Sequence, residues 1–530
     1  MQHFRKLLHM LCLVSAPVLL QAQVADHLEI GSSGFDLVKT GDGYISGGVS
    51  ADGIVHYFKG IPFAAPPVGD LRWKAPQPVV PWQGVRACDT FSASPMQSYP
   101  VPFGPWTAEY LISPKPISED CLYLNVWTGA ATPTAKLPVL VWIYGGGFVS
   151  GGSNVPVYDG EALARKGIIF VSINYRVGIF GFFAHPGLTR EAGYHASGNY
   201  GLLDQIAALK WVRKNIAAFG GDPGRITIAG QSAGSMSVNY LVASPLAKDL
   251  FQHAIAESGS RVFDEESKPV TLATAEQQGV ELARNLQVTS LEALRKLPAE
   301  ELLKKAKGDA FPIVDGYVVP EPLGEIFAAG KENPVSLLTG WNLDDIAQFG
   351  KFKSAAGFKQ EVTGRFGNAA EKLLTYYPAA TDSEAAISQE SLARDEMFGI
   401  QNGTWANLQA GTGQEKVYVY FFKRKVPATG DYIRYGAFHT GEVAYALDNL
   451  KFLKNRPLTK EDENLAKIMS AYWVNFVRTG NPNGPGLPQW PAYDQKDAGV
   501  MLLDTKPVAG TLPDKAGIDF LYQYYKNQHR

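Results

Sequence analysis

Alternating strands and helices between residues 138 and 242 restrict the fold of this chain more than any other feature. Two apolar runs, at 138–144 and 167–175, are nearly unbroken and rich in β-branched residues, which is typical of strands buried on both faces of a parallel sheet. Apolar residues then recur at helical spacing over 202–219, and a third run follows at 225–229. This order predicts an α/β fold with a largely parallel central sheet and helices on both of its faces.

Similar apolar runs continue the predicted sheet further along the chain, at 253–256, 335–341 and 417–422. A closing helix is predicted over 461–478, because its apolar residues form one stripe and a glycine follows it. The length of the chain alone would suggest several domains. No linker-like segment separates these elements, however, so we predict one domain over residues 23–530 with large insertions.

The first residues are typical of a cleaved secretory leader. The basic pair Arg5 and Lys6 precedes an apolar stretch that ends at Leu20, and small residues lie near Ala22. The stretch is too short to span a bilayer, so we expect no membrane anchor. Residues 1–22 are predicted to be a signal peptide that exports the protein, which would then be periplasmic or secreted.

The charge and the cysteine content narrow the range of partners. A formal net charge of -2 leaves no basic excess to attract phosphates, so we expect no nucleic acid partner, and small or uncharged ligands fit better. After the leader, two cysteines remain, Cys88 and Cys121. An even pair of cysteines in an oxidising compartment predicts a disulfide between them.

The run at 225–229 leads directly into Gly-Gln-Ser-Ala-Gly-Ser, which is followed by a predicted helix over 232–242. A bare G-x-S-x-G is weak evidence, but between a strand and a helix it describes a nucleophile elbow, whose tight turn needs small neighbours such as Gly230 and Gly234. The turn lifts the serine hydroxyl to the carboxyl end of the sheet. Ser232 is therefore a candidate nucleophile, and a structural serine in a turn is the alternative.

A serine nucleophile needs a histidine base that a carboxylate orients, and on this fold the acid precedes the histidine in the chain. His439 is the candidate base, because the other histidines after Ser232 lie in a strand-like run or beside the end of the chain. The acid is expected where a predicted strand ends in two adjacent carboxylates, Asp344 and Asp345. One would orient the imidazole and the other would face solvent, and Asp315, in a turn, is a weaker candidate.

Backbone N–H groups near the nucleophile are needed to stabilise the oxyanion of a tetrahedral intermediate. Residues 145–148, Gly-Gly-Gly-Phe, directly follow the strand predicted at 138–144 and supply backbone without side chains. Ala233, the residue after the candidate nucleophile, supplies a further N–H. The chain has no Gly-Lys-Ser/Thr phosphate loop and no metal-binding spacing of histidine or cysteine, so we expect neither a metal nor a cofactor.

Long ordered motifs between Gly60 and Gly480 resemble those of the type B carboxylesterases, the cholinesterase-like branch of the α/β-hydrolases. They include GIPFAAPPVGDLRW, SEDCLYLNVW, VLVWIYGGGF, NYRVGIFGF, GRITIAGQSAGS, GWNLDD and GAFHTGEV. The resemblance implies an α/β-hydrolase fold with large loop insertions, and a single catalytic domain over residues 23–530.

The resemblance also implies a role for each candidate residue. It selects Asp345 as the acid, although Ile346 replaces a usual glycine there and keeps Asp344 open. It implies that Ser258 lies near the acid and supports it. The remaining assignments are the nucleophile Ser232, the base His439, the oxyanion donors Gly146, Gly147 and Ala233, and a disulfide between Cys121 and Cys88.

Departures from the family pattern bear on the substrate. Gln231 stands where the family usually has glutamate, so we expect weaker support for an imidazolium and for cationic substrates. No aromatic match to a choline-binding site lies between Cys88 and Cys121, which argues against cholinesterase activity. Trp106 either lines the gorge or packs within its own loop.

Together these features predict a serine hydrolase that cleaves small-molecule carboxylic esters through an acyl-enzyme intermediate. Two alternatives remain open from the sequence. One is a non-catalytic binding or adhesion protein on the same fold, and the other is an amidase or thioesterase with the same triad.

Overall fold

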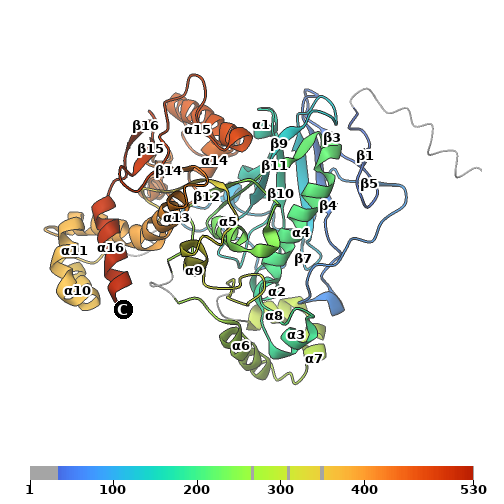
Figure 1. The fold of residues 1–530 in the computed structure, drawn as a ribbon, viewed down its shortest axis with the longest axis horizontal. Coiled ribbons are helices and arrows are strands. Elements are labelled where there is room, and N and C mark those ends of the chain that lie inside the picture. Colours follow the sequence, from blue (N-terminus) through green and yellow to red (C-terminus); the bar gives the residue numbers. More distant parts are fainter. Residues whose placement is uncertain (1–33, 264–267, 307–310, 347–350, 529–530) are drawn as a thin grey trace, which may run out of the picture.

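The computed structural model describes residues 34–263, 268–306, 311–346 and 351–528, and its centre is a sheet of 11 strands (Figure 1). In spatial order the strands are β16 (Val508–Thr511), β15 (Gly499–Leu503), β14 (Val417–Phe422), β13 (Ser336–Asn342), β12 (His253–Glu257), β11 (Gly221–Gln231), β9 (Leu137–Ile143), β10 (Ile169–Ile173), β8 (Tyr123–Thr128), β4 (His56–Pro62) and β3 (Gly48–Val49). All neighbours from β15 to β10 pair in parallel, whereas the outer pairs are antiparallel.

Helices cover both faces of this sheet (Figure 1). One face carries α4 (Tyr200–Asn215), α5 (Ala233–Ala243) and α13 (Ile400–Gly411), and the other carries α1 (Glu161–Ala164), α14 (Val443–Ala446) and α15 (Lys460–Thr479). The other helices are α2 (Gly178–Phe182), α3 (Pro186–Glu191), α6 (Leu272–Asn285), α7 (Leu291–Lys296), α8 (Ala299–Lys305), α9 (Leu323–Ala328), α10 (Ala355–Phe366), α11 (Ala370–Tyr376), α12 (Asp382–Arg394) and α16 (Lys515–Gln528).

The central elements predicted from apolar periodicity are confirmed. The first two predicted strands are β9 and β10, the third is the end of β11, and the later runs are β12, β13 and β14. The closing helix is α15, which begins at a capping box formed by Thr459 and Asp462 and ends at Gly480 with φ 69°. Its apolar stripe, including Trp473 and Phe476, is buried against the sheet.

The edges of the sheet were not predicted. β4 contains Gly60 and Pro62, and its register with β8 shifts between Phe58 and Ile61, so it lacks the alternation that marks a regular strand. β15 and β16 are short and form an antiparallel edge. Strands of this kind are defined by their neighbours more than by their own composition.

The disulfide predicted between Cys88 and Cys121 is not formed, because both thiols are free and buried in the structure. Cys88 lies beside the middle of β4, and Cys121 lies beside its C-terminal end. The Lys59 N–H donates to the Cys88 carbonyl, and the Phe63 N–H donates to the carbonyl of the residue after Cys121. The two cysteines therefore contact positions four residues apart, whereas the Cα atoms of a disulfide are at most about 7 Å apart.

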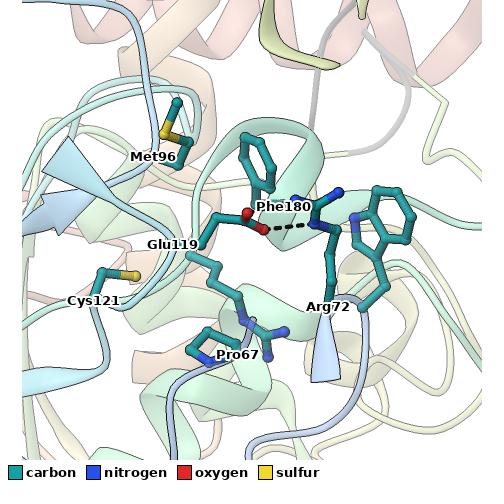
Figure 2. Close-up of a pocket in the computed structure, with 8 residues that line it drawn as sticks. Pro67, Arg72, Met96, Glu119, Cys121 and Phe180 are labelled. Carbon is teal, nitrogen blue, oxygen red and sulfur yellow. Dashed lines mark hydrogen bonds and ion pairs between the residues drawn. The ribbon is translucent and has the colours of Figure 1, made fainter. Parts of the chain in front are cut away.

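Cys121 instead lines a small pocket beside the ion pair of Arg72 and Glu119 (Figure 2). Arg72 Nε donates to Glu119 Oε2 at 2.6 Å. Burial raises the pKa of the Cys121 thiol, and burial also raises that of Cys88 to about 11. Both thiols therefore remain protonated and pack as small apolar groups.

The signal peptide predicted over residues 1–22 lies outside the described residues. Within the described ranges, no helix is both long and apolar enough to cross a bilayer.

Candidate active site

The turn between β11 and α5 has the geometry of a nucleophile elbow. Ser232 separates the two elements and has φ 59° and ψ -125°, a backbone conformation that side chains rarely adopt. Its glycine neighbours allow close packing, since a Cβ on Gly230 would lie 2.5 Å from the backbone of Gly234. The Ser232 N–H donates to the Glu257 carbonyl at 2.9 Å, which ties the elbow to the end of β12. The half-buried Ser232 is thus presented at the carboxyl end of the sheet.

The glycine loop after β9 lies against this elbow. Ile143 at the end of β9 pairs with Gly230, and a Cβ on Gly145 would lie 2.9 Å from the Ser232 Cβ. Gly146 and Gly147 follow with φ 116° and 62°, conformations that favour glycine, and both are exposed. The structure therefore brings both predicted oxyanion glycines next to the serine. Ala233 is the first residue of α5 and is buried.

His439 and Asp345 meet at the same edge of the sheet. The distance from His439 Nδ1 to Asp345 Oδ1 is 2.7 Å. The other carboxylate oxygen, Oδ2, accepts hydrogen bonds of 2.8 Å from the Ser258 hydroxyl and from the Asn342 N–H. Burial lowers the pKa of His439, but the hydrogen bond and charge of Asp345, together with the charge of Glu442, outweigh burial and raise it above its ordinary value.

Asp344 was predicted to face solvent if Asp345 is the acid. In the structure it instead binds the loop before His439. Its Oδ2 accepts a hydrogen bond of 2.7 Å from the Ala437 N–H, and its own N–H donates to the Ala437 carbonyl at 3.2 Å. Gly436 has φ 54°, and a Cβ there would collide with this carboxylate. Burial raises the pKa of Asp344, although the Ala437 hydrogen bond opposes it. The weaker candidate, Asp315, accepts from the N–H groups of its own turn and lies apart from His439 in these contacts.

Two aromatic side chains flank the imidazole of His439. Phe398 stacks on it with ring centroids 5.1 Å apart and an interplanar angle of 20°. Phe398 lies in a π-helical turn, Asp395–Gly399, inserted between α12 and α13, and such turns are frequent at functional sites. Trp106 approaches the imidazole edge to face, with centroids 6.4 Å apart. Trp106 therefore lines the site, whereas Phe398 was missed because a π-turn has no distinct sequence signature.

Gln231 occupies the position at which the family usually has a glutamate. Its side chain is buried, and Nε2 is 3.2 Å from Nε2 and 3.4 Å from Nδ1 of His439. Its Oε1 accepts a hydrogen bond of 3.5 Å from the Thr440 hydroxyl. A neutral amide thus contacts the histidine beside the candidate nucleophile.

Two buried glutamates near His439 were also missed by the sequence analysis. Glu257 Oε1 accepts a hydrogen bond of 2.7 Å from the Trp473 indole, and Glu442 Oε2 accepts one from the Asn342 amide. Their other carboxyl oxygens are buried and have no hydrogen-bond partner among the residues that the structure describes. Burial raises the pKa of Glu257 to about 8, and burial together with the charges of Glu257 and Asp345 raises the pKa of Glu442. Burial therefore favours the protonated form of both glutamates.

Within the part of the chain that the structure describes, no three histidine, cysteine or acidic side chains are grouped so that they could hold a metal ion. The groups beside the elbow are one imidazole, which Gln231 contacts, and one carboxylate with matched donors. Such an arrangement can move a proton and stabilise a developing oxyanion.

Comparison with known proteins identifies relatives over most of the chain. The model of the carboxylesterase family matches residues 36–521. The fumonisin B1 esterase of Sphingopyxis macrogoltabida is 36% identical over 469 residues, covering 84% of this chain and 83% of the relative. Carboxylesterase 1D of Rattus norvegicus is 35% identical and covers 87% of each chain.

Bacterial relatives include the para-nitrobenzyl esterase of Bacillus subtilis (strain 168), which is 35% identical and matches 85% of this chain and 92% of its own length. A solved structure of a PNB esterase superposes with a TM-score of 0.77 at 33% sequence identity, covering 92% of this chain and 99% of that chain. The sheet order, the elbow and these matches agree on an α/β-hydrolase fold. The chain belongs to the carboxylesterase family and is a carboxylic ester hydrolase.

Proposed function

We propose that this protein cleaves carboxylic esters through an acyl-enzyme, with Ser232 as the nucleophile, His439 as the base and Asp345 as the acid that orients the base. The observation that carries the proposal is the 2.7 Å hydrogen bond between His439 Nδ1 and Asp345 Oδ1, formed beside the elbow that ends β11. Donation of the Nδ1 proton to Asp345 leaves the Nε2 lone pair available to accept the serine proton.

The reaction then runs in two halves. Ser232 Oγ attacks the ester carbonyl carbon while His439 Nε2 takes the serine proton, and the N–H groups of Gly146, Gly147 and Ala233 stabilise the oxyanion. The tetrahedral intermediate collapses, and His439 passes the proton to the departing alkoxide. Water, deprotonated by His439, attacks the acyl-enzyme in the same way and releases the carboxylic acid.

The substrate class follows from the charge around the base. The amide of Gln231 contacts His439 where a carboxylate would attract a cation, and the aromatic rings of Phe398 and Trp106 flank the imidazole. We therefore propose uncharged or anionic small-molecule esters, rather than choline esters, as substrates. The names of the relatives, a fumonisin B1 esterase and a para-nitrobenzyl esterase, are consistent with ester substrates of varied structure.

A panel of chromogenic esters that differ in acyl length, with one amide and one thioester, tests the proposal. Ser232→Ala should lose more than about 10⁴-fold in kcat/KM on every ester that the wild type cleaves. Ser235→Ala is the matched control, because Ser235 lies in the same motif but donates to the Gly259 carbonyl. Undiminished activity of Ser232→Ala would refute the mechanism. Absence of ester turnover by the wild type would favour a non-catalytic binding protein. A preference for the amide or thioester would favour an amidase or thioesterase.

We also propose that residues 1–22 are removed on export and that residues 23–530 form a single catalytic domain. The proposal rests on the leader-like sequence and on the absence of a linker between the elements. Mass spectrometry of the mature protein in periplasmic and extracellular fractions would test it, and recovery of the intact chain in the cytoplasm would contradict it.

A further inference from the structure

We propose that Trp106, Thr440 and Gln231 form a one-way hydrogen-bonded chain that positions the His439 ring and holds the positive end of the Gln231 amide dipole against it. Trp106 and Thr440 are positioning residues in this proposal, since they act on the base through Gln231. The inference rests on the proposed function, because it concerns how the proposed base is tuned.

The chain connects a surface loop to the catalytic histidine in three contacts. The Trp106 indole N–H donates to the Thr440 Oγ1 at 3.0 Å. The Thr440 hydroxyl donates to the Gln231 Oε1 at 3.5 Å. The Gln231 Nε2 then contacts the imidazole of His439, at 3.2 Å from its Nε2.

The indole sets the direction of the chain. An indole N–H can donate but cannot accept, so the Thr440 oxygen must act as the acceptor in the first contact. The hydroxyl proton of Thr440 remains free to donate, and in the structure it donates to the amide oxygen of Gln231. The amide oxygen therefore faces Thr440 and the NH₂ group faces His439. This orientation places Oε1 on Thr440 and Nε2 on His439.

The amide packs against the imidazole without occupying its lone pair. Gln231 Nε2 is nearly equidistant from the two ring nitrogens of His439, at 3.2 and 3.4 Å. The in-plane directions of the two nitrogens diverge, so an atom that is equally close to both cannot be the in-plane partner of either. The Nε2 lone pair of His439 thus remains available to Ser232, while the amide dipole still acts on the ring.

The backbone of Thr440 provides an independent reason to assign a role to its hydroxyl. Thr440 is buried and has φ 82°, in the region that favours glycine and that β-branched residues rarely adopt. Glycine would relieve this strain, yet the position carries a threonine whose hydroxyl joins Trp106 to Gln231. Strained residues of this kind cluster at functional sites.

The loop that carries Trp106 is held rigidly enough to serve as the start of the chain. Phe103 and Trp106 exchange two backbone hydrogen bonds, of 3.2 and 3.1 Å, that close a tight turn. Arg456 donates to the Pro105 carbonyl within this turn at 2.9 Å, and its side chain is 6% exposed. The indole is therefore anchored from two sides over the histidine loop.

The titratable groups near His439 are three carboxyl groups among the residues that the structure describes. Asp345, after β13, bonds its Nδ1, Glu442 lies on its own loop, and Glu257 at the end of β12 acts on Glu442. The π-helical turn contributes the apolar face of Phe398, and the loop of Trp106 contributes its indole. The amide of Gln231 acts in addition to these groups. Its positive end disfavours the imidazolium and so keeps the base neutral at lower pH.

The direct test is Thr440→Gly, which removes the hydroxyl and relieves the backbone strain. This variant should fold with an unchanged or higher Tm. Its Gln231 amide is free to turn its oxygen toward the imidazolium, so the acid limb of kcat/KM should move up by about 0.5 to 1 pH unit. Thr440→Ser keeps the hydroxyl and should restore the wild-type pH profile. Trp106→Phe should shift the acid limb in the same direction by a smaller amount, and Trp82→Phe, whose indole bonds the distant Tyr44 carbonyl, is its control.

A double-mutant cycle of Gln231→Glu and Thr440→Gly separates the effect of the Gln231 amide orientation from a general change in packing. Gln231→Glu should raise the acid limb further than Thr440→Gly does, because both carboxylate oxygens are acceptors and together carry a full negative charge beside the ring. In the Gln231→Glu background, Thr440→Gly should add no further upward shift, because a carboxylate has no donor end for the chain to orient.

If Thr440→Gly hydrolyses esters and its acid limb stays at the wild-type pH, the proposed hydrogen-bonded chain is refuted. An equal additional shift in the Gln231→Glu background would overturn it as well. Failure of the proposed function would look different, since Ser232→Ala would then retain the hydrolysis of the wild type.

Discussion

Asp345 and the Glu257–Glu442 pair are carboxyl groups buried beside the same histidine loop, yet their surroundings differ. Asp345 accepts three hydrogen bonds, from the Ser258 hydroxyl, the Asn342 N–H and His439 Nδ1. Glu257 and Glu442 each accept one side-chain hydrogen bond and keep one buried oxygen without a partner. Three donors match an ionised carboxylate, which can only accept, whereas burial with few donors favours the protonated form.

The difference shows that donors, rather than depth, decide which buried carboxyl group carries charge. Asp345 and the two glutamates are almost equally inaccessible to solvent. Of the three, only Asp345 accepts three hydrogen bonds from the residues that the structure describes. The protonated glutamates can lie close to the site without adding two further negative charges to it.

The largest effect is expected when the carboxylate of Asp345 is replaced by an amide. Asp345→Asn should lower kcat/KM by about 10⁴-fold, because an amide can donate to Nδ1 and hold the imidazole in the wrong tautomer. Steady-state kinetics on a chromogenic ester measure this loss. Retention of more than a tenth of the wild-type activity would remove Asp345 from the triad.

The glutamate pair should make stability depend on pH. The pKa of Glu257 is raised from 4.5 to about 8 in the folded protein, so the folded state binds more protons between these values. The free energy of unfolding should therefore fall as the pH rises, by up to about 1.4 kcal/mol per pH unit. Glu257→Gln should reduce this slope.

Urea unfolding from about pH 5 to about pH 9 measures the slope. The matched control is Glu371→Gln, which removes an exposed carboxylate of α11 and should leave the slope unchanged. Identical slopes in Glu257→Gln and the wild type would show that the pair is ionised in the folded state.

A smaller effect is expected when one donor to Asp345 is lost. Ser258→Ala removes the 2.8 Å hydrogen bond to Oδ2 and leaves the contacts from Asn342 and His439 in place. A hydrogen bond to a charged group contributes about 1.5 kcal/mol, so kcat/KM should fall about tenfold with little change in KM. An unchanged kcat would mean that the backbone alone orients the acid.

The smallest effect on activity is expected at the adjacent carboxylate. Asp344→Asn keeps an oxygen that can accept from the Ala437 N–H, so kcat/KM should stay within about threefold of the wild type. Its thermal unfolding, measured in parallel, should show a loss of at most about 1 kcal/mol. A loss of activity as large as that of Asp345→Asn would reverse the assignment of the two carboxylates.

Local patterns allowed much of the site to be predicted. The Ser232 elbow, the glycine loop at 145–148 and the choice of His439 depend on short motifs placed after buried strands, and parallel strands bring such motifs to one edge. The choice between Asp344 and Asp345 could not be made from the residues alone. Two adjacent side chains point in different directions, and only the surrounding donors distinguish them.

Other features could not be predicted because their partners are distant in the chain. Phe398 reaches His439 through a π-helical turn, and Glu257 and Glu442 act on one another only when β12 and the histidine loop pack together. The disulfide between the two cysteines followed from counting and from resemblance. The prediction is wrong because the two cysteines lie beside different positions of β4, and the number of cysteines does not indicate how far apart they lie in the fold.

The sequence by itself determined the α/β class, the central strands, the family motifs and the candidate nucleophile and base, because apolar periodicity and tight-turn glycines are local constraints. The tertiary structure alone decided how Asp344 is bound, which carboxyl groups have few donors, and how Trp106 and Thr440 reach Gln231. The physical reason is that charge and hydrogen bonding depend on the donors and the solvent around a group, and folding assembles both from segments far apart in the chain.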